Sequence, residues 1–318
     1  MKLNQLRYFV SVVDKGSVRA AAAALGVSAA AVSQALRELE AATATPLIKR
    51  ESHGAVPTYA GRQLLTHARL ILGQLARAED ELAQIRGITG RMLAIGVTPW
   101  VSQSILPHAL ARFRAQRPDV RLDISESMGI IHPLLRDGTL DLVIGMPPAR
   151  QAAASFHVRK LFRCGVAVVG RLGHPRADCT SLRELGDQDW VLTLREEGIE
   201  EPLDKLLGSH GVAPPPHRIH FARSALVAIG MLEVGDLLTV CPWPLVESPF
   251  LRNRVQPLPI RERLGELPTS LIMRRSDTLS ATAQLFVDCF NEATQACLAS
   301  DDPVLRRIMN SVELVAAD

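Results

Sequence analysis

The stretch from residue 28 to about residue 42 carries hydrogen-bonding side chains at helical spacing. At about 100° per residue, Ser33, Gln34 and Arg37 fall on one side of a helix. The opposite side is apolar and holds Val32, Leu36 and Leu39, with Ala35 beside them. In the major groove, arginine pairs with guanine edges and glutamine with adenine edges. The pattern therefore indicates a helix that reads bases, and a three-helix bundle with a solvated face is the alternative.

Two shorter helices are expected before this one. The apolar stripe of the first consists of Leu3, Leu6, Phe9, Val10 and Val13, at spacings of three and four. Gly16 ends that helix, and Ser17 can cap a second one over residues 18–25. Gly26 gives a short break before Ser28 caps the third helix. Two helices joined by a short turn that contains glycine fit a helix-turn-helix.

A basic element follows the third helix. Residues 46–50 are extended in character, and residues 51–57 have the composition of a turn. Together they predict a small wing beside the third helix. In that wing Lys49, Arg50 and His53 would approach phosphates or a minor groove.

Composition and charge support a two-part organisation. The chain has 318 residues, 47% hydrophobic and 22% charged, which excludes a mainly disordered protein. Residues 1–77 contain ten Lys and Arg against four Asp and Glu, whereas residues 91–318 contain 25 against 26. A basic N-terminal part on a near-neutral remainder indicates a module that binds a polyanion. Because membrane-spanning and signal-peptide patterns are lacking, we expect a cytoplasmic protein without a membrane partner.

A long helix is expected from Thr58, its cap, to about Arg86. Two apolar rows repeat every seven residues, one with Ala68, Leu75 and Leu82, the other with Leu64, Ile71, Ala78 and Ile85. Their offset of three and four is the pattern of a coiled coil and predicts a homodimer through residues 61–88. Such a dimer would hold two reading helices on an interrupted palindrome in double-stranded DNA. The alternative is that this stripe packs on the chain's own C-terminal part.

These segments resemble the LysR-type transcriptional regulators. The matching segments are Leu6–Phe9, Gly16–Ala21, Leu25–Glu40, Pro46–Arg50 and Pro57–Gly61. The chain departs from the family pattern at Ala30, Ile48 and Pro57, where the family usually has Pro, Phe and Leu. These changes leave the helix-turn-helix intact. The Ala29-Ala30 pair lacks side chains that could read bases, so an operator sequence cannot be carried over.

The resemblance implies a DNA-binding transcriptional regulator. It places the polar side of the third helix in the major groove, and Ser17, Arg19 and the wing near the DNA backbone or minor groove. It also implies a tetramer of two DNA-bound dimers, with RNA polymerase as a further partner. The predicted DNA-binding residues are Ser17, Arg19, Ser28, Ala29, Ala30, Ser33, Gln34, Arg37, Arg50 and His53.

The C-terminal two-thirds alternates between strands and helices. Strands are expected over 92–97, 120–124 and 140–145, with helices over 105–117 and 130–136. A second set has strands near 165–169, 190–193, 218–222 and 237–241, helices near 200–210 and 224–234, a late strand at 271–273 and a closing helix over 281–298. This order favours a mostly parallel sheet.

Two such halves joined by crossover segments resemble a periplasmic-binding-protein fold, which is also the effector domain of the family. The expected fold class is α+β multidomain, with a winged helix-turn-helix, a long linker helix and a two-lobed α/β effector domain. The expected boundaries are 1–60, 61–90 and 91–300, with lobe I over 91–162 and 267–300 and lobe II over 163–266. Residues 301–318 form a helical or frayed extension whose apolar side chains could pack on a partner subunit.

Ligands of such folds bind at the carboxyl ends of strands, between the lobes. Thr98, Ser102 and Gln103 lie where a helix starts, and free N–H groups there favour an anion. We therefore predict a small organic anion, with aromatic acids among the candidates. The alternative is that the tryptophans are core and the arginines are surface. The predicted effector-binding residues are Thr98, Trp100, Ser102, Gln103, Glu126, Met128, Pro147, Thr193, Arg195, Arg223 and Trp243.

Other chemistry has weaker support. The five cysteines, Cys164, Cys179, Cys241, Cys289 and Cys297, include no C-x-x-C pair, so we expect neither a disulfide framework nor structural zinc. The G-x-S-x-G, H-E-x-x-H and P-loop motifs are missing, so no enzyme, metal or cofactor is expected. A solute receptor would explain residues 91–300 but would need an export signal, and a cytosolic enzyme would need a catalytic constellation.

Overall fold

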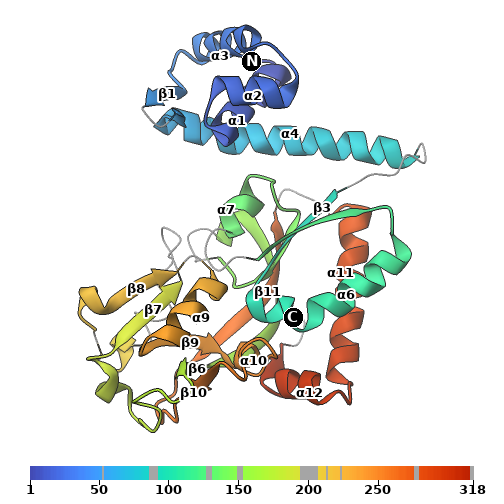
Figure 1. Cartoon of the computed structure of the whole chain (residues 1–318). Helices are drawn as coiled ribbons and strands as arrows, with labels where there is room; N and C mark the ends of the chain where they lie inside the picture. The colour runs from blue at the N-terminus through green and yellow to red at the C-terminus, as the bar shows by residue number, and fades with distance from the viewer. Residues whose placement is uncertain are drawn as a thin grey trace. The chain divides into compact units, whose positions relative to one another are not determined.

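A computed structural model describes residues 1–51, 54–85, 92–126, 131–148, 153–193, 207–212, 214–222, 224–275 and 279–315. The chain divides into two compact units (Figure 1). The first comprises residues 1–89 with the short segment 136–139, and the second comprises residues 90–135 with 140–318. Within the described ranges, no single helix is long and apolar enough to cross a membrane. Only the helices Val18–Leu25 and Ala29–Thr43 taken together, across a 112° bend, pass that test of length and composition.

The first unit consists of helices around a small hairpin. Its elements are α1 (Leu3–Lys15), α2 (Val18–Leu25), α3 (Ala29–Thr43), β1 (Ile48–Glu51), β2 (Gly54–Pro57) and α4 (Tyr59–Ile85). Figure 1 shows α1, α2 and α3 gathered beside one end of α4. Phe9 and Val12 of α1, Val32 and Leu39 of α3 and Ala68 of α4 are each fully buried in the shared core.

The helix boundaries agree with the predicted caps. Gly16 and Gly26 end α1 and α2 in the left-handed region, each at φ 67°. Ser17 Oγ accepts a 3.1 Å hydrogen bond from the Ala20 N–H, and Ser28 Oγ accepts one of the same length from the Ala31 N–H. These bonds satisfy donors that a helix N-terminus leaves free, so the two short turns are fixed by local chemistry.

The predicted wing is a two-stranded antiparallel hairpin. β1 pairs with β2 from Ile48 opposite Pro57 to Glu51 opposite Gly54, so part of the expected turn is a second strand. The Ala55 N–H donates to the Gly16 carbonyl at 2.7 Å, which joins the hairpin to the turn after α1. Gly54 has φ 125°, and a Cβ there would lie 2.4 Å from the Gly16 oxygen. Glycine is therefore the residue that fits this junction.

Helix α4 begins as the sequence predicts, because Thr58 Oγ1 accepts a 2.9 Å hydrogen bond from the Gly61 N–H. Its described part ends at Ile85, and Arg86 lies outside the described residues. The first turns pack on the helix-turn-helix core through Leu64, Leu65, Ala68 and Leu72. Farther along the same helix, Ile71 and Leu82 keep 40% and 57% of their surface exposed.

The second unit is a two-lobed α/β domain. Its strands are β3 (Met92–Val97), β4 (Arg121–Glu126), β5 (Leu142–Gly145), β6 (Phe156–Arg171), β7 (Asp189–Thr193), β8 (Ile219–Ala222), β9 (Leu237–Pro242), β10 (Val255–Pro257), β11 (Glu266–Arg274) and β12 (Val312–Leu314). Its α-helices are α5 (Pro99–Ser102), α6 (Ile105–Gln116), α7 (Ile131–Arg136), α9 (Ala225–Val234), α10 (Trp243–Val246), α11 (Ala281–Leu298) and α12 (Pro303–Asn310), with 3₁₀ turns at Ala153–Ser155, Leu182–Leu185 and Pro216–Arg218. The helix expected near 200–210 falls largely outside the described residues.

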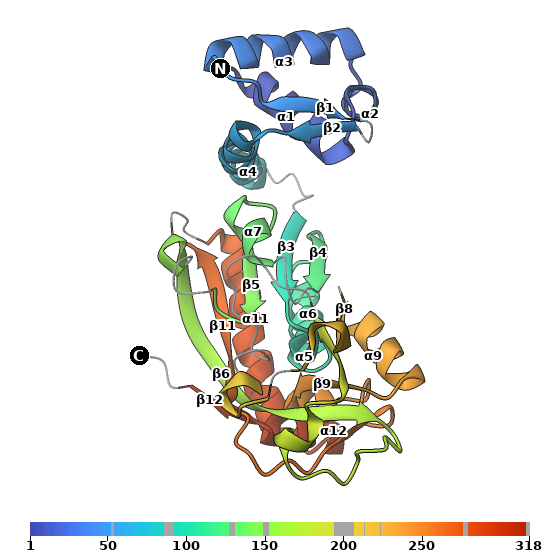
Figure 2. The ribbon, with the colours of Figure 1, turned by 90° about the vertical axis from the view of Figure 1, so that its left-hand side faces the viewer.

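One long strand belongs to both lobes. The strand order is β4-β3-β5-β11-β6-β9-β7-β8, in which β3 pairs in parallel with β4 and β5, and β7 pairs in parallel with β8 and β9. β6 is antiparallel to β11 through residues 156–165 and antiparallel to β9 through residues 166–169 (Figure 2). The prediction placed only its second half, near 165–169. Each lobe is therefore parallel at its outer strands, with antiparallel crossover strands at the centre.

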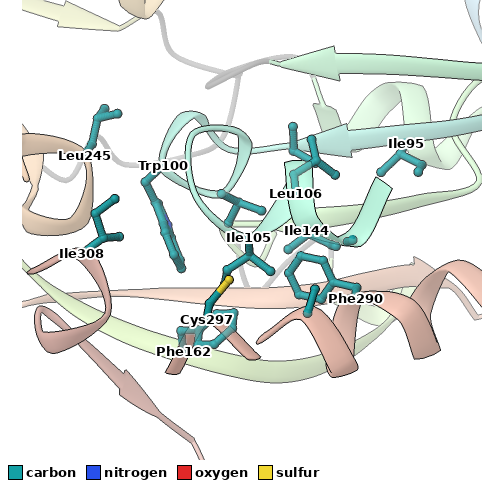
Figure 3. Close-up of a cluster of buried hydrophobic side chains, with 14 of the residues drawn as sticks. Ile95, Trp100, Ile105, Leu106, Ile144, Phe162, Leu245, Phe290, Cys297 and Ile308 are labelled. Carbon is teal, nitrogen blue, oxygen red and sulfur yellow. The ribbon is translucent and has the colours of Figure 1, made fainter. Parts of the chain in front are cut away.

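The C-terminal segment is helical over Pro303–Asn310, one of the two expected alternatives, but it packs within this domain, which corrects the expectation of an extension outside it. Ile308 of α12 is fully buried and Met309 is 4% exposed, both in the main core of the second unit. Figure 3 shows Ile308 on the same side of the cluster as Leu245 of α10. β12 then pairs with β6, with Val312 opposite Cys164 and Leu314 opposite Phe162. The tail therefore adds a strand to the edge of the crossover strand.

Candidate nucleic-acid interface and effector site

The outward side of α3 carries the polar residues that the sequence predicts. Gln34 and Arg37 are exposed and Ser33 is half-buried, whereas Val32 and Leu39 on the other side are fully buried. At the start of the helix Ser28 and Ala30 are exposed, and Ala29 is half-buried against the core of the unit. The helix thus packs by its apolar side and presents polar side chains on the side that another molecule can reach.

The polar residues of α3 form one hydrogen-bonded row. Arg37 Nη2 donates to Gln34 Oε1 at 2.8 Å, and Gln34 Nε2 donates to Glu38 Oε1 at 3.0 Å. The other Glu38 oxygen accepts from Gln5 Nε2 of α1 at 3.1 Å. The bonds from Gln34 and Gln5 lower the pKa of the Glu38 carboxyl from its ordinary value. Glu38 is therefore ionised at neutral pH, as the acceptor at the centre of the row.

Gln5 and Glu38 were missed by the sequence reasoning. Gln5 lies next to Leu6 within the apolar stripe of α1, and only 6% of its surface is exposed. A polar residue at a core position is a signal that a partner is nearby, because a buried amide must be hydrogen-bonded. Periodicity alone does not identify that partner, which lies 33 residues away on α3.

The flanking candidates have different positions. Arg19 of α2 and Lys49 of β1 are exposed, as a phosphate contact requires. Ser17 is half-buried and its hydroxyl is already used as the cap of α2. Arg50 lies in β1 with its side chain outside the described residues, and His53 lies outside them altogether.

At the effector site, Thr98 directly follows β3 and precedes α5. Its N–H donates to the Ile144 carbonyl at 3.0 Å, which ties it to the neighbouring strand β5. Its methyl group covers Gly145, where a Cβ would come within 3.0 Å of Thr98 Cγ2. The hydroxyl oxygen is buried and has no hydrogen-bond partner within the described part of the chain. An unpaired buried hydroxyl costs free energy, and a polar ligand atom can relieve that cost.

Ser102 and Glu126 are brought together from two different elements. Ser102 Oγ lies 2.5 Å from Glu126 Oε2 and 2.8 Å from the Pro99 carbonyl oxygen. Gln103, the next residue, is exposed. The N–H groups of Thr98, Ser102 and Gln103 donate to the carbonyls of Ile144, Thr98 and Pro99, which corrects the expectation that these three residues offer free N–H groups to an anion, because Ser102 ends the short helix α5 and does not start it. The Glu126 carboxylate also holds the Ser102 hydroxyl, and it would repel an anionic group at that atom.

Trp100 is a core residue, which corrects its predicted place in the effector site. Only 3% of its surface is exposed, and its ring meets Phe162 edge to face with centroids 5.4 Å apart (Figure 3). Its indole N–H donates to Thr269 Oγ1 at 3.2 Å, so the polar atom of the side chain is also satisfied inside the domain. The reason is that α5 turns this face of the helix toward the crossover strands.

The remaining candidates lie at other strand ends. Pro147 follows β5, and Trp243 follows β9 at the start of α10, and both are half-buried. A Cβ on Gly165 would lie 3.3 Å from Trp243 Cδ1, so the indole rests on the backbone of β6. Thr193 is the last residue of β7, with its side chain outside the described residues. Met128, Arg195 and Arg223 also lie outside them.

A metal site has no support in this geometry. Within the described ranges, no group of three or more His, Cys, Asp and Glu side chains is arranged to hold a metal ion. The thiols that the sequence offers are all buried in the domain interior. What the described residues can do is present hydrogen-bonding groups to a duplex from α3 and to a ligand from the strand ends.

Comparison with known proteins assigns both units of the chain to a protein family. A winged helix-turn-helix followed by a two-lobed binding domain defines a DNA-binding regulator with an effector-binding domain. The family model for the bacterial regulatory helix-turn-helix protein, lysR family, matches residues 3–62, and that for the LysR substrate binding domain matches residues 87–295. The chain therefore belongs to the LysR family of transcriptional regulators.

Curated relatives are similar along most of their length. The HTH-type transcriptional regulator GalR of Pseudomonas putida is 28% identical over 281 residues, covering 88% of this chain and 70% of the relative. PcaQ of Agrobacterium fabrum is 28% identical over 297 residues, covering 92% and 95%. GbpR of Azospirillum brasilense is 24% identical over 313 residues, covering 97% and 89%. These relatives are transcriptional regulators, consistent with the prediction of a protein that is not an enzyme.

Solved structures share the fold. CbnR, a LysR family transcriptional regulator, has a TM-score of 0.64 at 20% identity, covering 92% of this chain and 99% of the other. Full-length CbnR complexed with its target DNA has a TM-score of 0.60 at 20% identity, covering 92% and 100%. A full-length OxyR variant from Pseudomonas aeruginosa has a TM-score of 0.61 at 22% identity, covering 92% and 95%. At these identities the likeness concerns the fold.

Proposed function

We propose that this regulator binds an interrupted palindrome in double-stranded DNA as a homodimer, with α3 of each subunit in a major groove. The observation that carries the proposal is the exposed Gln34–Arg37 pair on a helix whose other side is buried. Arginine donates to guanine N7 and O6, the two acceptors on the major-groove edge of that base. Arg19 and the wing residues supply phosphate contacts, which give affinity without sequence preference. The protein acts in the cytoplasm, where bacterial DNA lies.

The dimer forms through α4, in the range 61–88. Part of the predicted heptad pattern serves the monomer, because Leu64 and Ala68 pack on the helix-turn-helix core. Ile71 and Leu82 remain exposed on the same helix. Apolar residues that pack between two subunits are exposed in this way when one chain is considered alone. Two such dimers join through their effector domains into a tetramer, and the bound ligand changes the packing of subunits and the contact with RNA polymerase.

The effector is a small organic anion, and Thr98 is the residue that supports its location. Its buried, unpartnered hydroxyl lies at the end of β3, where ligands of open α/β sheets bind. The half-buried faces of Pro147 and Trp243 suit an apolar or aromatic body. The anionic group lies away from Ser102, because Glu126 already holds that hydroxyl. Arg195 and Arg223 are the candidate partners for its charge.

The DNA half of the proposal is tested by a gel shift. The full chain is mixed with the duplex upstream of its own gene and with a scrambled duplex at about 0.05 and 0.2 M salt. We expect specific binding to survive competition by the scrambled duplex, and both complexes to weaken as salt rises. Equal binding to the two duplexes would overturn the proposal.

The effector half is tested by thermal shift. Wild type, Thr98→Val and the matched control Thr98→Ser are screened against aromatic and aliphatic carboxylic acids. A ligand that prefers the folded state raises the melting temperature, so one acid should stabilise wild type and Thr98→Ser more than Thr98→Val. If no acid shifts the melting temperature, or all three proteins shift equally, the proposed site is wrong.

A further inference from the structure

A buried amide in α1 holds the carboxylate at the centre of the polar row on α3. The Lys2 N–H donates to Gln5 Oε1 at 2.8 Å, so the amide oxygen of Gln5 is already engaged. Its NH2 group must then point the other way, and it does so by donating to Glu38 Oε2 at 3.1 Å. Because Gln5 is only 6% exposed, its amide depends on these two protein partners for hydrogen bonds.

The Glu38 carboxylate sets the orientation of the two residues that face outward, Gln34 and Arg37. An ionised carboxylate only accepts hydrogen bonds, so the side of Gln34 that meets Glu38 must be its NH2 group. The Gln34 carbonyl therefore faces the Arg37 guanidinium, from which it accepts at 2.8 Å. A rotated Gln34 amide would set two donors against each other at Arg37 and two acceptors at Glu38.

We propose that Glu38, held by Gln5, is a positioning residue that fixes which atoms Gln34 and Arg37 offer to base edges. The proposal rests on the proposed function of α3. After the row has formed, Arg37 retains free N–H groups and Gln34 retains one amide N–H, so the row offers mostly donors. Guanine is the base whose major-groove edge has two acceptors, N7 and O6. The row therefore selects guanine at the contacted position.

Two variants test this inference by different chemistry. Glu38→Gln keeps the size of an exposed side chain but no longer forces the Gln34 amide into one orientation. Gln5→Met keeps the length of a buried side chain and the net charge, and it removes the donor to Glu38. The controls are Asn4→Ala, which removes an exposed amide from the same helix, and Glu292→Gln, which removes one negative charge on α11.

The readout is specificity. Duplexes are selected from a random pool with the wild-type full chain, and dissociation constants are measured by fluorescence anisotropy at about 0.15 M salt. The ratio of the constants for random and selected duplex should fall at least about fivefold in both variants, the smallest loss expected for one paired base contact. The preference for guanine at one position should also weaken, and the controls should keep the wild-type ratio.

A double-mutant cycle shows whether Glu38 acts through Gln34. In a Gln34→Ala background, Glu38→Gln should cause no further loss of the ratio, because its target has gone. Circular dichroism shows whether Gln5→Met folds. If it does not, the Glu38→Gln variant and the double-mutant cycle test by themselves whether Glu38 positions Gln34.

Two results would overturn the inference. In one, the variants keep the wild-type ratio and base preference. In the other, Glu38→Gln strengthens binding to random and selected duplex equally, as loss of a repelled charge alone would do. Failure of the wild type to prefer any selected duplex would instead remove the proposed function.

Discussion

The Arg37 guanidinium donates to the amide oxygen of Gln34 one turn earlier on α3, at 2.8 Å. Residues three apart lie side by side on a helix, so this pair forms without distortion of the backbone. It reduces the freedom of two long side chains that would otherwise lose rotamer entropy on contact with DNA. The outward side of α3 is thus partly ordered before any duplex arrives.

Replacement of Arg37 by alanine should weaken binding to the operator by about 1–3 kcal/mol and relax one base position. The reason is the loss of a donor pair that only the correct base can satisfy. Fluorescence anisotropy with operator and random duplex measures the loss of affinity and the loss of base preference. Arg19→Ala is the matched control, for which we expect equal losses on the two duplexes, since we propose that this exposed side chain contacts phosphate. An equal loss for Arg37→Ala would show that it too is only an electrostatic contact.

Leu82→Glu should weaken association through α4 and leave each subunit folded. Leu82 is 57% exposed within its own chain, so a charge is tolerated there in a single subunit but not in an apolar seam. Each buried leucine side chain contributes about 1.5–3 kcal/mol, so the association constant at this seam should fall at least tenfold. Sedimentation velocity over a range of concentrations measures it, as a loss of tetramer in favour of the smaller species that the effector domains hold together. Gln295→Glu, on exposed surface of α11, should sediment like wild type, and a Leu82→Glu protein that also sediments like wild type would exclude this seam.

Ile308→Ala should destabilise the second unit by about 2–5 kcal/mol, because it leaves a cavity at a fully buried position. All three tryptophans, Trp100, Trp190 and Trp243, lie in that unit, so their fluorescence in a urea titration reports its unfolding separately. The control Arg306→Ala, on an exposed position of α12, should change stability by less than about 0.5 kcal/mol. Similar midpoints for the two variants would show that the tail is not part of the core.

None of the five cysteines should react with a thiol reagent while the protein is folded at pH 8. All five are buried, and burial raises the pKa of Cys164 to about 12 and that of Cys241 as well. A raised pKa keeps the thiol protonated, and the reactive thiolate appears only as the pH approaches that value. Colour release from an aromatic disulfide reagent should be slow in buffer and complete in denaturant. A prompt reaction of one thiol in buffer would contradict this.

Local chemistry made the first unit predictable. Gly16, Ser17 and Ser28 mark helix ends by rules that involve only the adjacent residues, and the observed caps follow those rules. The outward side of α3 follows equally from its angular spacing. The heptad rows predicted a long helix, which α4 is, but their spacing could not show that the first turns of this helix pack on the chain's own helix-turn-helix.

What the sequence did not predict depends on contacts between distant segments. The first half of β6 contains the adjacent charged residues Arg159 and Lys160, which interrupt the alternation typical of a strand, and it is a strand because β11 pairs with it. The apolar pattern of the tail fits packing on a partner subunit as well as packing on its own domain. The choice depends on the free edge of β6 with which β12 pairs, and that edge cannot be read from the tail. The place of Trp100 in the core, and the bond between Gln5 and Glu38, arise in the same way.

The strand β12 has a consequence for the order of events at the ribosome. Domains generally fold as units during synthesis, beginning with the N-terminal one. The first unit has nearly all of its residues long before β12 is translated, whereas the second cannot close its sheet until residues 312–314 emerge. A nascent chain can therefore have a folded first unit, with its helix-turn-helix, before its second unit has folded. During this interval the incompletely folded second unit is the part of the chain that is exposed to chaperones and proteases.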